Sequence, residues 1–450
     1  MSIREPDAQL QSVSISLPGE QKLAVWVLAG GLVGLLLAHP SLYSRSLAYI
    51  LLIQAIFLVW LVILVRERFR WKWMLPPKEL VGAVSLLGVG SLLAWFLSPL
   101  ASVKSLFFLS AQFLFLWLGW WLGRDQDLVK LLGGVALWGA GVASVYGLFQ
   151  YWQLDPLSTV TLFADRVVSF FENPNHFGNY LAGLLPLGLV AFLQAVNWKS
   201  RSGWCALVGL MYIGLLITAS RGAWWAALAG SLVLLGGYVY QVYRGVVGVR
   251  WIWIGVLLVL LGTITALFSE QTVTKGPAGP VSVRERMLSS KNIVEPGAVE
   301  DFAIAHRYRI WQVTWEMIRE RPLLGQGYGV YPRRFVEIRK TLQERGVFST
   351  EEWNTYFDTP YAHNEYLHIW AESGLLGLAG FMGLITLVVW YAVRGGWRTR
   401  LERLDLWGAL GLVAAMLVHS MVSYPLHLSL NGMVFWLALG ILANREFVAA

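Results

Sequence analysis

The sequence predicts an all-α polytopic membrane protein with about twelve transmembrane helices and one long loop that contains amphipathic helices. Of its 450 residues, 56% are hydrophobic and only 14% are charged, and the mean hydropathy is +0.56. A chain of this composition is far too apolar for an ordinary soluble protein. The 24 tryptophans suit the aromatic belts of the two membrane interfaces. The single cysteine, Cys205, excludes an intramolecular disulfide and a cysteine-based metal site.

Apolar runs of about 20 residues, the length that crosses a bilayer, recur along the chain. Residues 1–22 are polar and lack the features of a signal peptide, so we expect a retained tail. A long polar loop is expected at 269–362 and a second tail at 445–450. Spans are predicted at 23–38, 47–65, 80–98, 104–123, 128–151, 176–196, 204–219, 222–242 and 251–268, which form the region 23–268, and at 363–391, 406–424 and 428–444, which form the region 363–444.

The distribution of Lys and Arg among the short loops predicts the orientation of the chain, because these residues resist translocation. The loops on one side of the membrane carry most of these basic residues. The loops on the other side, apart from the long one, hold only Arg45, Lys104, Arg166 and Arg221. We therefore expect cytoplasmic termini and an external long loop, and the net charge of +8 needs no nucleic acid to explain it. The basic set comprises Arg66, Arg68, Arg70, Lys72, Lys78, Arg124, Lys130, Lys199, Arg201, Arg244, Arg250, Arg394, Arg398, Arg400 and Arg403.

The long loop begins with an apparently irregular segment, 270–300, which is rich in Gly, Pro, Ser and Val. The next segment, 302–320, repeats apolar residues at helical spacing and is followed by Pro322, so it predicts an amphipathic helix on the membrane or over the bundle. Three glycines after it mark turns; without a preceding strand they do not favour a nucleotide site. The expected apolar face is Ile304, Tyr308, Trp311, Trp315 and Ile318, and the turn glycines are Gly325, Gly327 and Gly329.

A histidine near the end of the loop is the leading candidate for chemistry. Thr359-Pro360 predicts a helix start that places His363 in the first turn. The positive end of a helix would keep its imidazole neutral. Glu372 would point the opposite way, and a histidine that merely anchors the helix remains an alternative. The face expected below His363 is Leu367, Trp370, Gly374 and Gly377, whose glycines allow a close helix approach.

Two external turns offer polar groups beside this histidine. The turn 171–179 carries Glu172 and Asn175, which could hold a sugar or a headgroup or simply cap a helix. The turn 218–222 carries Arg221, whose guanidinium matches a phosphate in a bidentate way. The alternative for Arg221 is a side chain that reaches ordinary phospholipid headgroups.

Six of the arginines in the long loop could together form a basic surface that faces the membrane, and their position outside the membrane is not explained by orientation. An anionic ligand is one interpretation, and a solvated face balanced by glutamates is the other. Asp125 and Asp127 have a spacing that can hold a metal, but they lie in an expected cytoplasmic loop, and no other external carboxylates share such a spacing, so no metal is expected. The arginines are Arg307, Arg309, Arg319, Arg321, Arg333 and Arg334.

At these residues the sequence resembles the O-antigen ligase and O-antigen polymerase superfamily of bacterial membrane glycosyltransferases. The ligase signature is His, then Asn, Ser or Gln, nine residues, Gly, two residues, and Gly, Thr or Tyr. His363, Asn364, Gly374 and Gly377 fit it without a gap. Further features that look like the family are Asn173 to His176, Ser220 to Gly222, Arg307 with Trp311, Pro322 to Gly325, and Tyr424 to His427.

The resemblance implies transfer of a glycan from undecaprenyl diphosphate to an acceptor hydroxyl on the periplasmic face of the inner membrane. The transfer would invert the anomeric carbon and use neither a metal nor another cofactor. Arg221 and Arg307 would bind the diphosphate, and His363 would orient or deprotonate the acceptor. The acceptor would be lipid A core for a ligase or a glycan for a polymerase. Substrate-binding candidates are Asn364, Glu172, Asn175, Arg309, Tyr328 and Arg333.

Two other classes of function stay open on the sequence. A transporter of a small anion or a lipid-linked glycan would need ionisable groups near the middle of its spans, where His419 is the main exception to an apolar pattern. That histidine could instead hydrogen-bond a neighbouring helix. A structural partner in a polysaccharide export complex would tolerate conservative changes at His363.

Overall fold

The computed structural model describes residues 78–100, 103–155, 166–248, 250–276, 279–289, 302–347, 359–394 and 403–444, with residues 27, 29–31 and 55. The spans predicted at 23–38 and 47–65 lie almost wholly outside these residues. The other ten predicted spans each coincide with an observed helix. Within the described residues, eight helices are long and apolar enough to cross a membrane, and two more are apolar but shorter. The all-α polytopic prediction is therefore confirmed, while the count of twelve stays a prediction.

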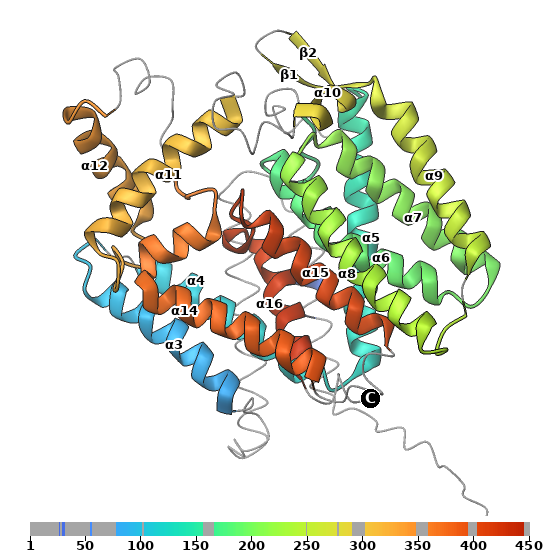
Figure 1. Ribbon diagram of the computed structural model, residues 1–450, viewed down its shortest axis with the longest axis horizontal. Coiled ribbons are helices and arrows are strands. Elements are labelled where there is room, and N and C mark those ends of the chain that lie inside the picture. Colours follow the sequence, from blue (N-terminus) through green and yellow to red (C-terminus); the bar gives the residue numbers. More distant parts are fainter. Residues whose placement is uncertain are drawn as a thin grey trace, which may run out of the picture.

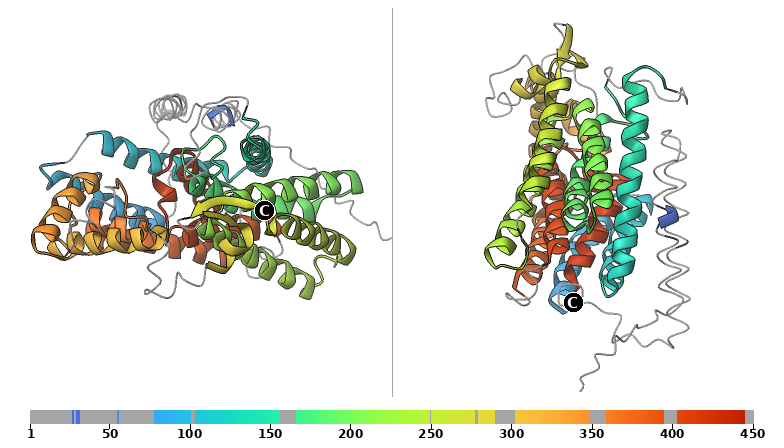
Figure 2. Two further views of the ribbon diagram at one scale, coloured as in Figure 1. Left: turned by 90° about the horizontal axis from the view of Figure 1, so that it is seen from above. Right: turned by 90° about the vertical axis from the view of Figure 1, so that its right-hand side faces the viewer.

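The apolar helices run roughly side by side (Figures 1 and 2). The eight long ones, with their observed bounds, are α3 (Lys78–Phe96), α4 (Val103–Leu122), α5 (Gln126–Tyr151), α6 (Pro174–Gln194), α7 (Trp198–Ile217), α8 (Arg221–Tyr243), α9 (Trp251–Ser269) and α14 (Glu365–Arg394). The two shorter ones are α15 (Leu404–His419) and α16 (Ser429–Ala443).

Helix α15 lies in the centre of this arrangement, against α8 and α6, while α14 packs along α3 and α16 along α4. Glycines allow these helices to approach closely, as small residues do in membrane bundles. A Cβ added at Gly440 of α16 would lie 2.1 Å from the carbonyl oxygen of Leu116 in α4. A Cβ at Gly237 of α8 would lie 2.0 Å from the Trp407 ring of α15. These positions therefore fix the helix pairs that surround α15.

The segment predicted to be irregular contains regular structure, so that prediction was wrong. Strands β1 (Thr272–Gly276) and β2 (Gly279–Ser282) form an antiparallel hairpin. Ser282 then caps the short helix α10 (Val283–Leu288) by a reciprocal exchange with Glu285. Figure 2 shows the hairpin standing at one end of the bundle, above α9. Its short strands carry Gly and Pro, which hid the alternating pattern of a strand.

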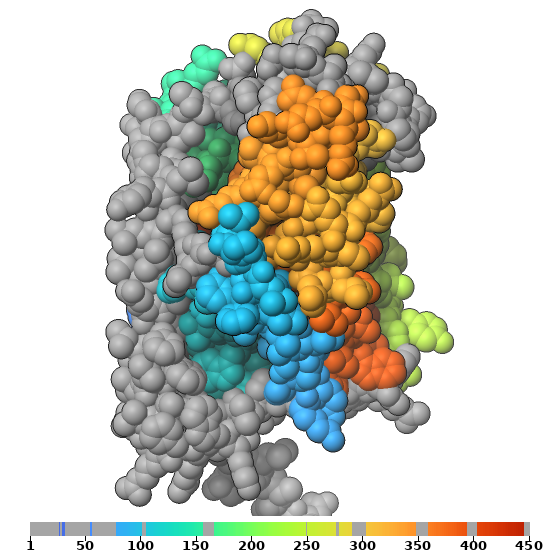
Figure 3. All heavy atoms as spheres, turned by 90° about the vertical axis from the view of Figure 1, so that its left-hand side faces the viewer, coloured from blue at the N-terminus to red at the C-terminus, as the bar shows by residue number. Residues whose placement is uncertain are grey.

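The predicted amphipathic helix is confirmed as α11 (Phe302–Glu320), and a second helix, α12 (Tyr331–Glu344), follows it. The predicted apolar face was partly wrong, because Tyr308 is 53% exposed and Trp315 is 42% exposed. The buried side chains are instead Ile310, Val313, Met317 and Ile318. The buried face of α11 differs from the predicted one because the helix packs against α12 and α14. Figure 3 shows α11 and α12 as one continuous surface that meets the ends of α3 and α14.

The start of α14 differs from the prediction. The helix begins at Glu365, and His363 precedes it in the left-handed region with a φ of 52°. Thr359 does not cap the helix, because its hydroxyl bonds within a local turn to Tyr361. Asn364 takes that role, since its Oδ1 accepts from the amide of Leu367 at 3.0 Å. His363 therefore sits on a strained turn rather than in the first turn of a helix.

The predicted continuous face below His363 is interrupted at Gly374, whose φ of 66° and ψ of −172° are not helical. At this break α14 pairs with the segment that follows α11. The amide of Leu375 donates to Pro322 O at 2.9 Å, and the amide of Gly327 donates to Glu372 O at 3.0 Å. A Cβ at Gly374 would lie 2.1 Å from Leu323 O. Gly377 does make the close helix approach that the sequence predicted, because a Cβ at Gly90 of α3 would lie 2.9 Å from its amide nitrogen.

We expect Gly374→Ala to lower the stability of the folded protein by about 2–4 kcal/mol, through the overlap with Leu323 and the positive φ. Thermal unfolding of the purified protein should then start at least about 5 °C lower. The matched control is Gly383→Ala in the same helix, where an added Cβ meets nothing within 4 Å. Equal unfolding temperatures for the two variants would contradict the proposed packing at Gly374.

Candidate functional site

The site is organised by the turn that follows α15, residues 420–424, which leads into the short 3-10 helix η3 (Pro425–His427). Three consecutive carbonyls of this turn accept hydrogen bonds from other segments. Ser420 O accepts from the Glu365 amide at 2.8 Å, and Met421 O accepts from Asn364 Nδ2 at 3.1 Å. Val422 O accepts from Arg307 Nε at 3.0 Å. The 420–424 turn thus joins α11 to the start of α14.

The first turns of α6 and α8 meet the same turn. His176 Nε2 lies 3.2 Å from Tyr424 Oη. A Cβ added at Gly222, the second residue of α8, would lie 2.6 Å from a methyl group of Val422. His419 Nδ1 lies 2.7 Å from Asn179 Oδ1 of α6, so this buried histidine does hydrogen-bond a neighbouring helix. Arg221, the first residue of α8, is therefore brought close to the turn that Arg307 holds.

The two polar turns singled out in the sequence also contact each other. Asn175 Oδ1 accepts from Ser220 Oγ at 2.8 Å and from Arg166 NH2 at 3.2 Å. Arg166 Nε in turn donates to Thr218 O at 2.9 Å. Asn173 caps α6 through the amide of Asn175, so the turn 171–179 does serve as a helix cap. Asn175 fixes the residue immediately before Arg221.

His363 lies among aromatic and basic side chains. Its ring meets that of Tyr424 edge-on with centroids 4.8 Å apart, and that of His306 with centroids 6.5 Å apart. Its Nδ1 is buried and has no hydrogen-bond partner among the described residues. Trp311 Nε1 donates to Ala362 O at 3.0 Å, so α11 also holds the residue before this histidine.

Burial and the positive charge of Arg307 hold the pKa of His363 well below its usual value, and His306 and His176 act in the same direction. Burial lowers the pKa of His306 to about 4, with further contributions from Arg307 and Arg339. The imidazole of His363 is therefore neutral near pH 7. The sequence predicted a neutral imidazole, but the cause is burial beside cations, because the helix starts two residues later.

Both candidate arginines are held by backbone and side-chain oxygens. Arg221 is 5% exposed, and its NH1 donates to Ser289 O at 3.1 Å and Ser289 Oγ at 3.0 Å, after α10. Arg307 NH1 donates to Ala303 O at 3.1 Å within α11. Arg307 is thus oriented on the 420–424 turn, whereas the Arg221 side chain is held by Ser289. The convergence of Arg221, Arg307 and His363 on one substrate stays a prediction.

Other predicted residues lie apart from this cluster. Arg309 NH1 donates to Gln312 Oε1 at 3.1 Å on α11, and the exposed Arg333 donates to Leu100 O at 3.2 Å at the end of α3. Tyr328 lines a small cavity elsewhere. Glu172 lies nearer to this cluster. The pKa of Tyr361 is raised to about 12, first by burial and then by the charges of Glu372 and Glu365, and the charge of Glu172 makes a smaller contribution in the same direction. Asp125 caps α5, which gives the Asp125 and Asp127 pair a structural explanation.

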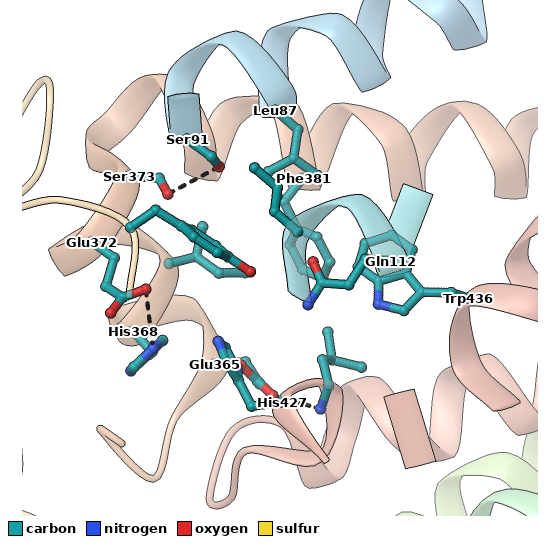
Figure 4. A pocket seen from close by; sticks show the side chains of 14 residues that line it. Leu87, Ser91, Gln112, Glu365, His368, Glu372, Ser373, Phe381, His427 and Trp436 are labelled. Atoms are coloured by element: carbon teal, nitrogen blue, oxygen red, sulfur yellow. Dashed lines mark hydrogen bonds and ion pairs between the residues drawn. The ribbon is translucent and has the colours of Figure 1, made fainter. Parts of the chain in front are cut away.

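A buried cluster of Glu365, His368, Glu372 and His427 was not anticipated as a unit. Glu372 accepts from the amides of Gly329 and Tyr331, each at 2.9 Å. Glu365 Oε2 lies 2.8 Å from His427 Nδ1. Figure 4 shows these side chains around the cavity that Tyr328 also lines. The sequence signal was the spacing of three and four residues between Glu365, His368 and Glu372.

Acidification should destabilise the fold partly through His363. A histidine with a lowered folded pKa contributes stability that is complete above pH about 6.5 and is lost as the pH falls toward the folded pKa. The loss is at most about 1.4 kcal/mol per pH unit. We expect the unfolding temperature of His363→Gln to fall less between pH 7 and pH 5 than that of the wild type. A larger fall in the variant would contradict a neutral buried imidazole.

Comparison with known proteins supports the resemblance found in the sequence. Residues 205–382 match the protein family described as O-antigen ligase. The O-antigen ligase of Salmonella typhimurium (strain LT2) is 27% identical over 216 residues, which are 48% of this chain and 46% of that protein. The chain thus aligns with about half the length of this curated relative. The matched region, which includes Arg221, Arg307 and the signature from His363 to Gly377, is therefore similar to the O-antigen ligase family.

Proposed function

We propose that the protein is an O-antigen ligase-type membrane glycosyltransferase. It moves a glycan from undecaprenyl diphosphate to a hydroxyl of lipid A core on the periplasmic face of the inner membrane, with inversion and without a metal in the reaction. The observation that carries the proposal is the assembly of Arg307, His363 and the start of α8 around the 420–424 turn. Catalytic groups must reach one substrate, and contacts of Arg307, His363 and the first turn of α8 with one turn support a shared site.

Arg221 and Arg307 bind the diphosphate in this proposal. Backbone carbonyls orient both guanidiniums, so little side-chain entropy remains to be lost when an anion binds. Arginine suits the task because its planar fork matches phosphate oxygens. As the bond to the sugar breaks, negative charge grows on the leaving diphosphate, and arginines that are already in place stabilise that charge without rearrangement.

His363 orients the acceptor hydroxyl in this proposal and takes its proton as the hydroxyl oxygen attacks the anomeric carbon. The neutral imidazole can accept a hydrogen bond from a hydroxyl. In the free protein burial and the charge of Arg307 make it a weak base. A bound diphosphate would offset the arginine charge and raise the pKa of His363, so the base becomes more effective when the donor is present.

All but one of the remaining candidates divide between the two substrates. Asn364, Glu172 and Asn175 lie on segments that meet near the 420–424 turn and are assigned to the donor sugar. Arg309 lies on α11 and Arg333 on α12. We assign these two arginines to the anionic acceptor, lipid A core, whose phosphates need cations. Tyr328 lines the separate buried cavity, so it is assigned to neither substrate. The cytoplasmic termini and the external 269–362 loop complete the proposed orientation.

Polymerisation of O-antigen or another exopolysaccharide is the alternative within the same chemistry, because the donor site is the same and only the acceptor differs. A transporter of a small anion or a lipid-linked glycan is the alternative from another class. The observation that would serve transport is the buried pair His368 and Glu372 inside the first turns of α14, since ionisable groups within spans mark transport pathways. Glu372 accepts hydrogen bonds from two backbone amides of the loop, which favours a structural role.

We expect purified protein in lipid to transfer glycan from a synthetic undecaprenyl diphosphate donor to lipid A core, and His363→Ala to lose at least about 100-fold of this rate. The assay offers lipid A core or glycan alone as acceptor. Chain lengthening with glycan alone would identify a polymerase. No turnover with either acceptor would contradict both enzymes and favour transport, which a flux assay in vesicles would measure.

We expect Arg307→Lys to lose most of the transfer rate, because lysine cannot make the bidentate contact and also loses the Nε bond to Val422. Arg319→Lys is the matched control on the same helix, since Arg319 is 66% exposed and lies 3.6 Å from Glu316. Rates and unfolding temperatures of both variants are measured together. Similar transfer rates for the two variants, with both folded, would contradict a role for Arg307 in diphosphate binding.

A further inference from the structure

A second cluster of chemistry-bearing side chains lies near the candidate site, on two segments that are far apart in sequence. His368 and Glu372 are one helical turn apart on α14, and His427 ends η3. One ligand atom of each residue lies within 4.8 Å of the others. His368 and Glu372 are each 2% exposed. The transfer chemistry proposed above does not use this cluster.

The negative charges of the buried carboxylates in and beside this cluster must be neutralised. Glu365 is completely buried beside it, so two carboxylates share a site without solvent. Buried carboxylates are costly unless they are paired. Within the described residues, Glu365 pairs with His427 and Glu372 with His368, so the ionisable partners of both carboxylates are imidazoles. Two protons or one divalent cation would neutralise the set.

One distance in the cluster is compatible with a bound cation. His368 Nε2 lies 3.5 Å from Glu372 Oε2, which is long for a charge-assisted hydrogen bond of about 2.7–2.9 Å. It is close to the separation of about 3.4 Å between two ligand atoms that each lie about 2.1 Å from a tetrahedral zinc ion. The amide of Ala362 lies 3.4 Å from His368 Nδ1, beyond the good hydrogen-bond range of about 2.7–3.2 Å. Both polar contacts of His368 are therefore long, although its ring is buried against those of Tyr331 and His427.

The surroundings of His427 resemble those of a metal-bound histidine. Its Nδ1 lies 2.8 Å from Glu365 Oε2, so this nitrogen carries a proton and leaves the lone pair on Nε2. Carboxylates orient the imidazole ligands of metal sites in this way. Figure 4 shows Glu365, His368, Glu372 and His427 around one cavity. It leaves about 20 Å³ for the centre of a water-sized occupant, room for an ion or a water.

We propose that His368, Glu372 and His427 bind one divalent transition-metal ion of the zinc class as a structural centre. Two imidazoles with one carboxylate favour such an ion over magnesium or calcium, which prefer oxygen ligands. Ser91, Ser373 or a water could complete the coordination, since the two serine hydroxyls meet at 3.1 Å at the same cavity.

The ion would join three segments that support His363. Glu372 already binds the amides of Gly329 and Tyr331, which ties the loop after α11 to α14. His427 adds η3, and His368 adjoins Ala362, the residue before His363. The centre would therefore stabilise the 359–364 turn without taking part in glycan transfer. Glycan transfer itself stays independent of the metal.

The test measures metal in the full-length protein, purified in detergent from cells grown with zinc and through a tag that binds no metal. Elemental analysis should find about one zinc per chain. Protein stripped with a chelator should unfold at a lower temperature, regain the loss on adding Zn²⁺, and develop visible cobalt absorption bands with Co²⁺. The cobalt titration uses the wild-type chain, so the test does not depend on a variant that folds.

Variants separate this proposal from the proposed function. His427→Gln and Glu372→Gln should lose the zinc, whereas His363→Ala should keep it while losing transfer. Zinc below about a tenth of an equivalent, with no uptake by stripped protein, would overturn the proposal and leave two protons as the counterpart. Equal zinc in His363→Ala, His427→Gln and wild type would overturn it as well, because the metal would then lie elsewhere.

Discussion

The carbonyl groups at the end of α15 impose the constraint on which the rest of the site depends. A helix leaves its last carbonyls without partners inside the helix, and in a membrane bundle these groups must be satisfied by protein. Here Ser420, Met421 and Val422 receive donors from the Glu365 amide, Asn364 and Arg307. The negative end of the helix also favours a cation such as Arg307. Satisfying one helix end therefore brings the insertion and the signature segment together.

A second constraint joins α14 to the segment that follows α11. The break of α14 at Gly374 lets the segment after α11 form backbone hydrogen bonds with the opened turn. Gly325 takes part from the other side, since a Cβ there would lie 2.3 Å from Glu372 O. Gly374, the first glycine of the signature, is thus explained by a backbone contact rather than by helix packing. The glycine three residues later does pack against another helix, α3.

The sequence was sufficient for much of this architecture. Runs of about 20 apolar residues located ten helices, because burial in lipid requires length and hydropathy and little else. Pattern reasoning also located α11 and the turns at Gly325, Gly327 and Gly329. Pattern reasoning failed where contacts with another segment of the chain determined the local structure. The apolar face of α11 turned toward α12 and α14, and Asn364 rather than Thr359 capped α14.

The candidate site shows the same division. His363, Arg221 and Arg307 could be named from residue type and place, but their proximity depends on the 420–424 turn, which no local pattern describes. The cluster of His368, Glu372 and His427 was missed because η3 supplies one member from more than fifty residues away in sequence. Helical spacing revealed the pair on α14, and only tertiary structure could add the third.

The most direct test of the account is a cryo-electron microscopy structure of the protein with undecaprenyl diphosphate glycan bound. The account predicts the diphosphate between the guanidiniums of Arg221 and Arg307, with the first sugar carbon facing His363 across the space for an acceptor hydroxyl. Diphosphate density away from both arginines, on the far side of the 420–424 turn, would contradict it.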